Sequence, residues 1–169
     1  MNEQEIVNKV AQSGLIQLNL EDFSPEGERI VFDLKDYLFQ DLILKEKEFR
    51  SALKSIEWPI YKNKHVAIDC STDAIIPTWA FMLVAVYLQP YSQTIIFGDL
   101  DALESELFRK TIAQLDVDQY RDERIIIQGC GNKPVPKSAY VEITRILQPV
   151  AKSIMFGEAC STVPLFKNG

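Results

Sequence analysis

The stretch Arg124-Ile125-Ile126-Ile127-Gln128-Gly129-Cys130-Gly131-Asn132-Lys133-Pro134-Val135-Pro136 decides the fold of this chain. It begins with a dense apolar run and ends in a segment rich in glycine and proline, just before a helical pattern that starts at Ser138. Glycine permits positive φ and close backbone approach, whereas proline fixes φ and removes a donor. The stretch therefore predicts a buried strand, a shaped turn and a helix, in that order.

The same rhythm fills the chain from residue 65 onward. Short apolar runs predict strands at 65–69, 93–97, 124–128 and 152–156, and helical periodicity predicts helices at 77–88, 100–115 and 138–147. Strands of about five residues that alternate with helices indicate βαβ units. We therefore expect an α/β fold with a mostly parallel sheet of about four strands and flanking helices.

The first 60 residues show other periods. Residues 3–13 have the apolar spacing of a helix, and alternation at 15–20 and 29–34 predicts a two-stranded antiparallel unit. The helical period returns from Asp36 to about Ile56. We expect a single domain over 1–169, with 1–60 forming the N-terminal helix, the strand pair and a helix, and 61–169 forming the βαβ core.

Composition narrows the function classes. The chain has 169 residues, 47% of them hydrophobic and 25% charged, and a net charge of -6 without a basic cluster, so we expect no nucleic-acid partner. The acidic N-terminus lacks a signal-peptide layout, and the apolar run 74–88 is shorter than the roughly 20 residues of a membrane span. These features predict a cytoplasmic protein with reduced thiols and no membrane partner.

The 77–88 helix carries almost no polar side chains. Such a helix is either buried on both sides or part of a subunit interface. Base rates favour the core interpretation, and a homodimer seam is the alternative.

The chain has three cysteines, and each follows a predicted strand. Cys70, Cys130 and Cys160 come after the strands at 65–69, 124–128 and 152–156. If these strands are neighbours in one parallel sheet, the three turns meet at its carboxyl edge. Three thiolates at one point suit zinc, iron or an iron–sulfur cluster.

Polar groups around the cysteines fit such a centre. The expected hydrogen-bond donors to sulfur are Ser71, Thr72, Gly131, Asn132, Ser161 and Thr162, and the candidate fourth ligands are Asp69, Asp73, Glu158 and His65. His65 by itself follows a lysine-rich connector, which favours a surface position.

The alternative for the cysteines is that they are inert. Free cysteine is often a small buried hydrophobe, and the chain lacks a C-x-x-C motif. Three functions therefore stay open: a metal- or iron–sulfur-binding accessory protein, a non-enzymatic interaction or scaffold protein with inert buried thiols, and a thiol- or persulfide-handling enzyme.

Several segments along nearly the whole chain resemble one family of bacterial proteins. These segments are Glu5–Val10 with Ser13-Gly14, Pro25–Arg29, Ile75–Ala80, Gly129–Gly131 with Lys133–Pro136, and Gly157–Leu165. That family is catalogued as a domain of unknown function, so the resemblance implies neither an activity nor a site. It does imply that such proteins are encoded near iron–sulfur cluster assembly components, which makes an assembly protein one candidate partner.

Overall fold

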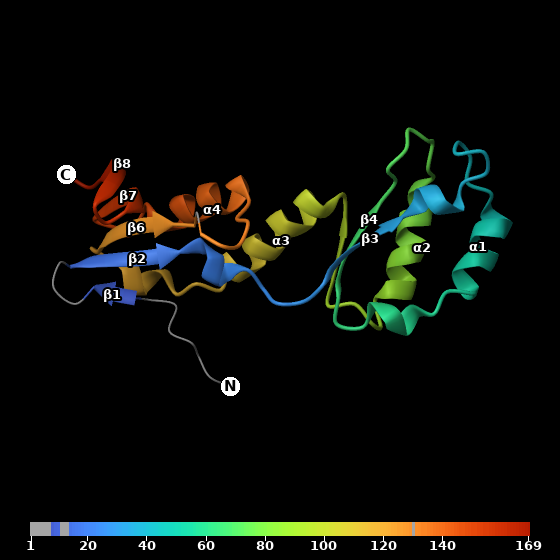
Figure 1. The fold of residues 1–169 in the computed structure, drawn as a ribbon, viewed down its shortest axis with the longest axis horizontal. Helices are drawn as coiled ribbons and strands as arrows, with labels where there is room; N and C mark the ends of the chain where they lie inside the picture. The colour runs from blue at the N-terminus through green and yellow to red at the C-terminus, as the bar shows by residue number, and fades with distance from the viewer. Residues whose placement is uncertain (1–7, 11–13, 130) are drawn as a thin grey trace. The chain divides into compact units, whose positions relative to one another are not determined.

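The structure is a computed structural model that describes residues 8–10, 14–129 and 131–169 of the chain. The chain divides into two compact units (Figure 1). Unit 1 is formed by Met1–Pro25 together with Leu107–Gly169, and unit 2 by Glu26–Glu106. Unit 2 is thus inserted into the sequence of unit 1. Each unit is described below by itself.

Unit 1 contains a five-stranded sheet, here named sheet A, in the order β1-β2-β6-β7-β8. Strands β2, β6 and β7 are parallel, and β1 and β8 add antiparallel partners at the two edges. The strands are β1 (Asn8–Val10), β2 (Leu15–Asn19), β6 (Arg124–Gln128), β7 (Ser153–Glu158) and β8 (Ser161–Lys167). The helices are η1 (Leu20–Phe23), the C-terminal part of α3 (Leu100–Ile112), η4 (Val117–Tyr120) and α4 (Lys137–Leu147).

Unit 2 contains a three-stranded parallel sheet, here named sheet B, in the order β3-β4-β5. The strands are β3 (Arg29–Asp33), β4 (His65–Asp69) and β5 (Thr94–Phe97). The helices are η2 (Leu34–Tyr37), α1 (Glu46–Lys54), η3 (Trp58–Tyr61), α2 (Thr78–Leu88) and the N-terminal part of α3.

The two units repeat one sequence pattern. Phe49-Arg50 in α1 corresponds to Phe108-Arg109 in α3, a shift of 59 residues (108 minus 49). The same shift relates Leu88-Gln89-Pro90 to Leu147-Gln148-Pro149, and Phe97-Gly98 to Phe156-Gly157. At the N-terminus the repeat has a shift of 14 (34 minus 20), between Leu20-Glu21-Asp22-Phe23 and Leu34-Lys35-Asp36-Tyr37.

The backbone follows the sequence repeat in detail. Before the second strand of each unit, Asn63 and Asp122 adopt φ of 60 and 59. Their amides donate to Tyr91 O at 3.0 Å and to Val150 O at 2.9 Å, respectively. Gly98, directly after β5, and Gly157, the second-last residue of β7, have φ of 128 and 121, a region that disfavours other residues. Unit 2 and the core of unit 1 are therefore two copies of one fold.

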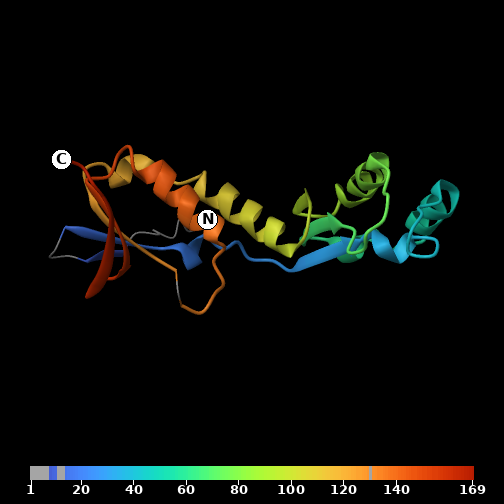
Figure 2. The ribbon, with the colours of Figure 1, turned by 90° about the horizontal axis from the view of Figure 1, so that it is seen from above.

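Equivalent side chains build the two cores. In unit 1, α3 and α4 lie on one face of sheet A (Figure 2), where Phe108 and Ile143 share a core with Ile125. In unit 2, α1 and α2 occupy the equivalent face of sheet B. Burying these apolar surfaces supplies most of the stabilisation that each unit receives.

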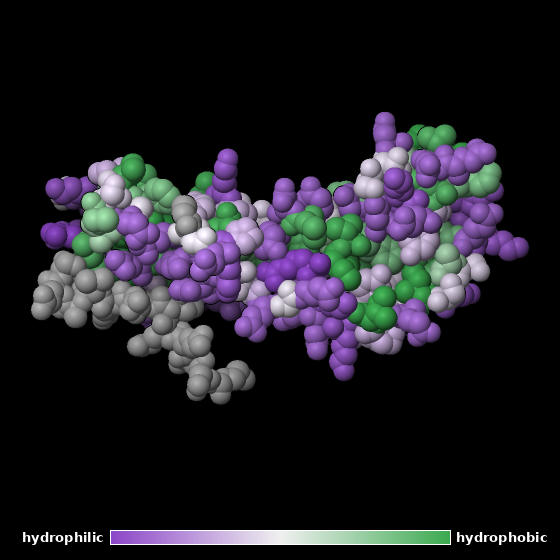
Figure 3. Space-filling model, in the orientation of Figure 1, coloured by the Kyte–Doolittle hydropathy of each residue, from purple (hydrophilic) through white to green (hydrophobic). Residues whose placement is uncertain are grey.

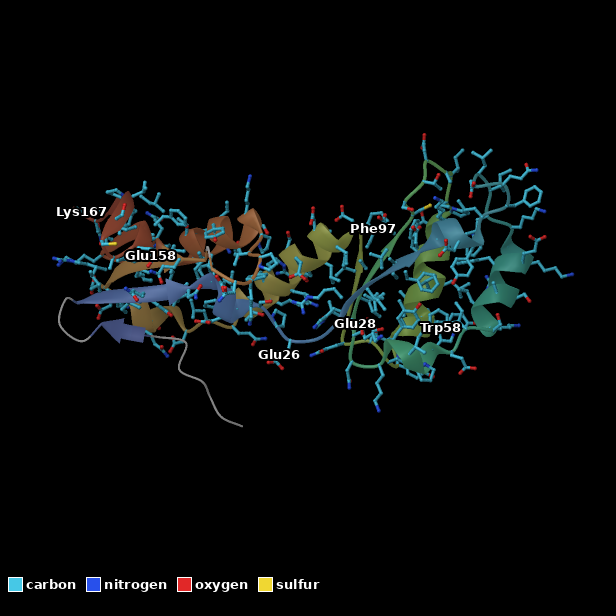
Figure 4. All side chains as sticks on the ribbon, viewed as in Figure 1. Glu26, Glu28, Trp58, Phe97, Glu158 and Lys167 are labelled. Carbon is cyan, nitrogen blue, oxygen red and sulfur yellow. The ribbon has the colours of Figure 1, made fainter. Side chains whose placement is uncertain are left out.

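An aromatic cluster distinguishes the core of unit 2. Trp58 stacks on Tyr87 with ring centroids 4.9 Å apart and on Phe32 at 5.7 Å (Figure 4 labels Trp58). Its indole Nε1–H donates to Leu53 O at 2.9 Å, so the polar atom of this buried ring is paired. The equivalent position in unit 1 is Val117.

The expected α/β class with mostly parallel strands and flanking helices is confirmed. The predicted antiparallel pair of 15–20 and 29–34 is wrong, because β2 pairs in parallel with β6 and β3 pairs in parallel with β4. Each strand is the first strand of a different repeat, which its own alternation does not reveal. The predicted helix at 3–13 is wrong at residues 8–10, which form β1, and the rest of it lies outside the described residues.

Two further predictions can be compared with the structure. The predicted helix from Asp36 to Ile56 is shorter, because η2 and an irregular segment precede α1. The single domain over 1–169, with parts 1–60 and 61–169, stays a prediction beside the two compact units. None of the described helices is long and apolar enough to cross a membrane.

Candidate functional site

The three cysteines do not follow strands of one sheet. Cys70 follows β4 of sheet B, whereas Cys160 lies in the turn between β7 and β8 of sheet A. Cys130 lies outside the described residues. The expectation that three neighbouring strands carry the cysteines to one edge is therefore wrong, because β4 is not a neighbour of β6 or β7.

The described residues contain no group of three or more His, Cys, Asp or Glu side chains suited to hold a metal ion. Cys70 Sγ donates a weak hydrogen bond to Thr72 O at 3.6 Å, and Cys160 is exposed. Of the candidate fourth ligands, Glu158 accepts a hydrogen bond from Gln128 Nε2 at 2.8 Å. Asp69 ends β4, and Asp73 lies in the exposed part of the loop that follows.

His65 is a buried structural residue, contrary to the expected surface position. Its side chain is 2% exposed, its Nε2 lies 2.8 Å from Glu26 O and its Nδ1 lies 3.0 Å from Thr94 Oγ1. Because a carbonyl accepts, Nε2 carries the proton and Nδ1 accepts from the threonine. Both ring nitrogens are occupied, so His65 has no free lone pair for a metal.

The expected hydrogen-bond donors to sulfur donate elsewhere or lie in a hairpin. Ser71 donates from its amide and hydroxyl to the Asp33 carboxylate. The amides of Gly131 and Asn132 donate to Glu21. Ser161 and Thr162 pair with Glu158 and Gly157 in the β7–β8 hairpin, and Thr72 lies in the loop after Cys70.

Glu21 holds the loop that follows β6. This largely buried carboxylate accepts from the amides of Gly131 at 2.5 Å, Asn132 at 3.1 Å and Lys133 at 3.1 Å. Burial raises the pKa of Glu21, but these three hydrogen bonds and the charge of Lys133 lower it more, so its pKa lies below the ordinary value. A side chain at Gly131 would meet the Glu21 carboxylate, which would have to shift to make room for it.

Asp33 has the equivalent task in unit 2. It ends β3 and binds Ser71, while its Oδ1 also accepts from the Lys35 amide at 2.9 Å. Burial raises the pKa of Asp33, and the hydrogen bonds from Ser71 and Lys35 lower it more. In both units a carboxylate thus fixes the loop after the second strand of the repeat. Sequence reasoning missed both residues, although Glu21 lies in the first copy of the repeated Leu-x-Asp-aromatic segment and Asp33 directly precedes the second copy.

The exposed side of α2 is the most unusual surface of unit 2. The helix buries Ala80, Val84 and Leu88, yet Met82 and Val86 are 64% and 67% exposed. With Thr78 they form a stripe one turn apart, which we name the α2 face. The interpretation of this helix as buried on both sides is therefore wrong for the α2 face.

The equivalent helix of unit 1 shows that the repeat does not require this surface. Positions Thr78, Met82 and Val86 correspond to Lys137, Val141 and Arg145 in α4. Arg145 forms an ion pair with Glu142, whereas α2 has no charged residue between Thr78 and Leu88. The exposed side of this helix therefore carries charged residues in unit 1 and none in unit 2.

The strand next to α2 also exposes an apolar side chain. Phe97 at the end of β5 is 72% exposed and packs edge-on against Phe81 of α2, with ring centroids 5.1 Å apart (Figure 4). Figure 3 shows hydrophobic surface in green where Figure 1 places β5 and the start of α3. Exposed apolar side chains that gather on a surface are typical of protein-interaction sites.

Comparison with protein families gives one match. Residues 4–168 match the family described as Protein of unknown function (DUF2480). A search of curated proteins and a search of solved structures gave no match.

Proposed function

The chain belongs to the family described as Protein of unknown function (DUF2480), and we propose that it is a non-enzymatic interaction protein that holds a partner protein on the α2 face. The observation that carries the proposal is the contrast between α2 and α4, since equivalent helices of one repeat differ in the polarity of their exposed sides. Solvent alone gives no reason for an uncharged stripe on only one of them.

The chemistry of the α2 face defines the partner. Met82 and Val86 offer apolar surface, and the flexible thioether of Met82 adapts to the shape of a neighbour. The helix has no charge with which to pair an acidic or basic group. The partner therefore presents an apolar surface of its own, such as one face of an amphipathic helix.

A photo-reactive side chain placed on the α2 face tests the proposal. Benzoylphenylalanine at Met82 should give a discrete cross-linked product with another protein in cells, and Val86→Lys should abolish that product. The matched control is the same probe at Val141, the equivalent position of α4, whose native side chain is 70% exposed. No product at Met82, an equal product at Val141, or a product that contains only this chain would overturn the proposal.

The thiols have no part in this function. Replacing Cys70, Cys130 and Cys160 with serine should leave both the fold and the cross-link at Met82 unchanged. If the triple variant loses the cross-link while keeping its fold, the cysteines contribute to the partner site and the proposal is wrong in this respect.

The metal or iron–sulfur site at Cys70, Cys130 and Cys160, and the thiol- or persulfide-handling enzyme, stay predictions from the sequence. Metal and sulfide content of anaerobically purified protein tests the first. About one metal per chain that is lost in each Cys→Ser variant would support it. Rapid alkylation of one cysteine at neutral pH in metal-free protein would support the second.

A further inference from the structure

The outer edge of β5 lacks the strand that covers the equivalent edge in unit 1. Strand β7 corresponds to β5 and carries β8 as an antiparallel partner. Sheet B ends at β5, and nowhere in the described part of the chain does a strand pair with its outer edge. One copy of the fold is thus closed at this edge and the other copy is open.

The backbone of β5 is prepared for such a partner. The Gly98 amide donates to Ile68 O of β4 at 3.0 Å. Because successive residues of a strand turn their N–H and C=O groups to opposite sides, Phe97 and Ile95 direct theirs to the outer edge. The equivalent residues of β7 are Ile154 and Phe156, which lie opposite Phe166 and Val163 of β8.

This edge carries neither the charged side chains nor the proline that protect many exposed strands. Thr94, Ile95, Ile96 and Phe97 include neither a charge nor a proline. The other edge strand of sheet B differs, because β3 begins with Arg29 and ends with Asp33. Arg29 is also ion-paired with Glu104 at 2.6 Å. An open, uncharged edge is therefore specific to β5.

We propose that β5 pairs with β5 of a second copy of this chain across a two-fold axis, so that sheet B continues from one chain into the other. Two identical strands related by such an axis are antiparallel, as β7 and β8 are. Ile95 of each chain lies opposite Phe97 of the other, so the outward N–H and C=O groups pair, and the two Ile96 residues face each other on the axis.

The composition of β5 favours a second copy of this chain as its partner. An uncharged strand meets its own copy without burying an unpaired charge, although the whole chain has a net charge of -6. The Phe81–Phe97 pair stands beside the strand on the α2 side and adds apolar area to the same seam. The proposal uses the edge of β5 and the side of α2 next to it, so it stands apart from the partner of the outward α2 face.

A designed disulfide tests the pairing and its register. In a background with Cys70, Cys130 and Cys160 replaced by serine, Ile96→Cys should form a covalent dimer under mild oxidation. Residues opposite each other in a pair without hydrogen bonds have Cα atoms about 4.5 Å apart, within the range that a disulfide spans. Val31→Cys is the matched control, because Val31 and Ile96 flank Ala67 at the same level on the two edges of sheet B. A monomeric Ile96→Cys protein, or equal cross-linking of Val31→Cys, would overturn the proposal.

Light scattering on the full chain gives a test that keeps the native cysteines. The wild-type protein should have the mass of two chains, and Phe97→Lys should reduce it to one, since a lysine at an open edge blocks strand pairing. Met82→Lys should leave the dimer intact. A wild-type monomer at micromolar concentration, or a Phe97→Lys dimer, contradicts the proposal. The cross-link from residue 82 should persist in the Phe97→Lys monomer, so the two proposals can fail separately.

Discussion

Units 1 and 2 are two copies of one fold that differ mainly where they meet their surroundings. Phe49 and Phe108 occupy the same buried position, and so do Leu88 and Leu147. By contrast, Val86 stands where unit 1 has Arg145. The cores are similar because both must fill the same space between a sheet and two helices. The surfaces diverge because solvent constrains them weakly, so a surface that becomes apolar in one copy alone indicates a separate task.

The edges of the two sheets also differ between the units. Sheet A has an antiparallel strand at each edge, and sheet B has neither among the described residues. The three parallel strands thus suffice for the repeat, and β1 and β8 are additions that close unit 1. Open edges invite pairing with another chain, and both proposed contacts therefore lie on unit 2.

The largest expected effects come from the equivalent core phenylalanines. Phe49→Ala and Phe108→Ala should each lower the free energy of unfolding by about 3–5 kcal/mol, because each leaves a cavity in a closed core. If each repeat has its own cooperative core, hydrogen exchange should accelerate at the β4 amides in Phe49→Ala and at the β6 amides in Phe108→Ala. Chemical denaturation and amide exchange measure the two quantities.

The exchange pattern also tests whether 1–169 is a single domain. Equal acceleration at β4 and β6 in both variants would contradict separate cores and support one cooperative domain. Phe156→Ala serves as the control, since this residue lies on β7 outside the set of fully buried side chains and should cost less.

A buried histidine in one copy stands where the other copy has an exposed arginine. His65 and Arg124 begin the second strand of each repeat. His65→Leu should destabilise the protein by about 1–3 kcal/mol, since it leaves the Thr94 hydroxyl and Glu26 carbonyl without their partner. Arg124→Leu should change the free energy of unfolding by about 0.5 kcal/mol or less. Urea unfolding of both variants measures the contrast, and equal losses would contradict it.

The sequence predicted the local elements of the βαβ region well. Strands β4 to β7 and helices α2 to α4 lie close to their expected ranges, since short apolar runs mark buried strands and longer apolar or amphipathic stretches mark helices. It predicted the pairing of β2 and β3 wrongly, because register with distant strands is absent from local alternation. The sequence repeat with a shift of 59 residues could have indicated the correct pairing. Because β2 and β3 are the first strands of two repeats, each is expected to pair with the second strand of its own repeat.

The candidate site was less accessible from the sequence. Cys70 and Cys160 were expected at the carboxyl edge of one sheet because each follows a strand, yet the sheet order places these strands in different sheets. The α2 face lay inside a helix expected to be buried on both sides. The structure shows that Met82 and Val86 are exposed, and the charged Arg145 in α4 marks the position of Val86 as one that solvent reaches. Hydrophobicity alone cannot distinguish a core side chain from an interface side chain.

The smallest expected effect at neutral pH concerns Glu21, whose place in unit 2 is taken by Lys35. The folded-state pKa of Glu21 lies below its unfolded value, so the ionised carboxylate contributes stability that is fully present above the unfolded pKa. That contribution disappears as pH falls through the lower, folded pKa. NMR titration of the Gly131, Asn132 and Lys133 amides should show this ionisation below pH 4.5, the ordinary value, because all three donate to the carboxylate. Glu21→Gln should remove the titration while keeping an oxygen acceptor, and Lys35→Gln should leave it unchanged. An amide titration at or above the ordinary pKa would show that burial outweighs the three hydrogen bonds, and that the loop after β6 is held less firmly than its equivalent at Asp33.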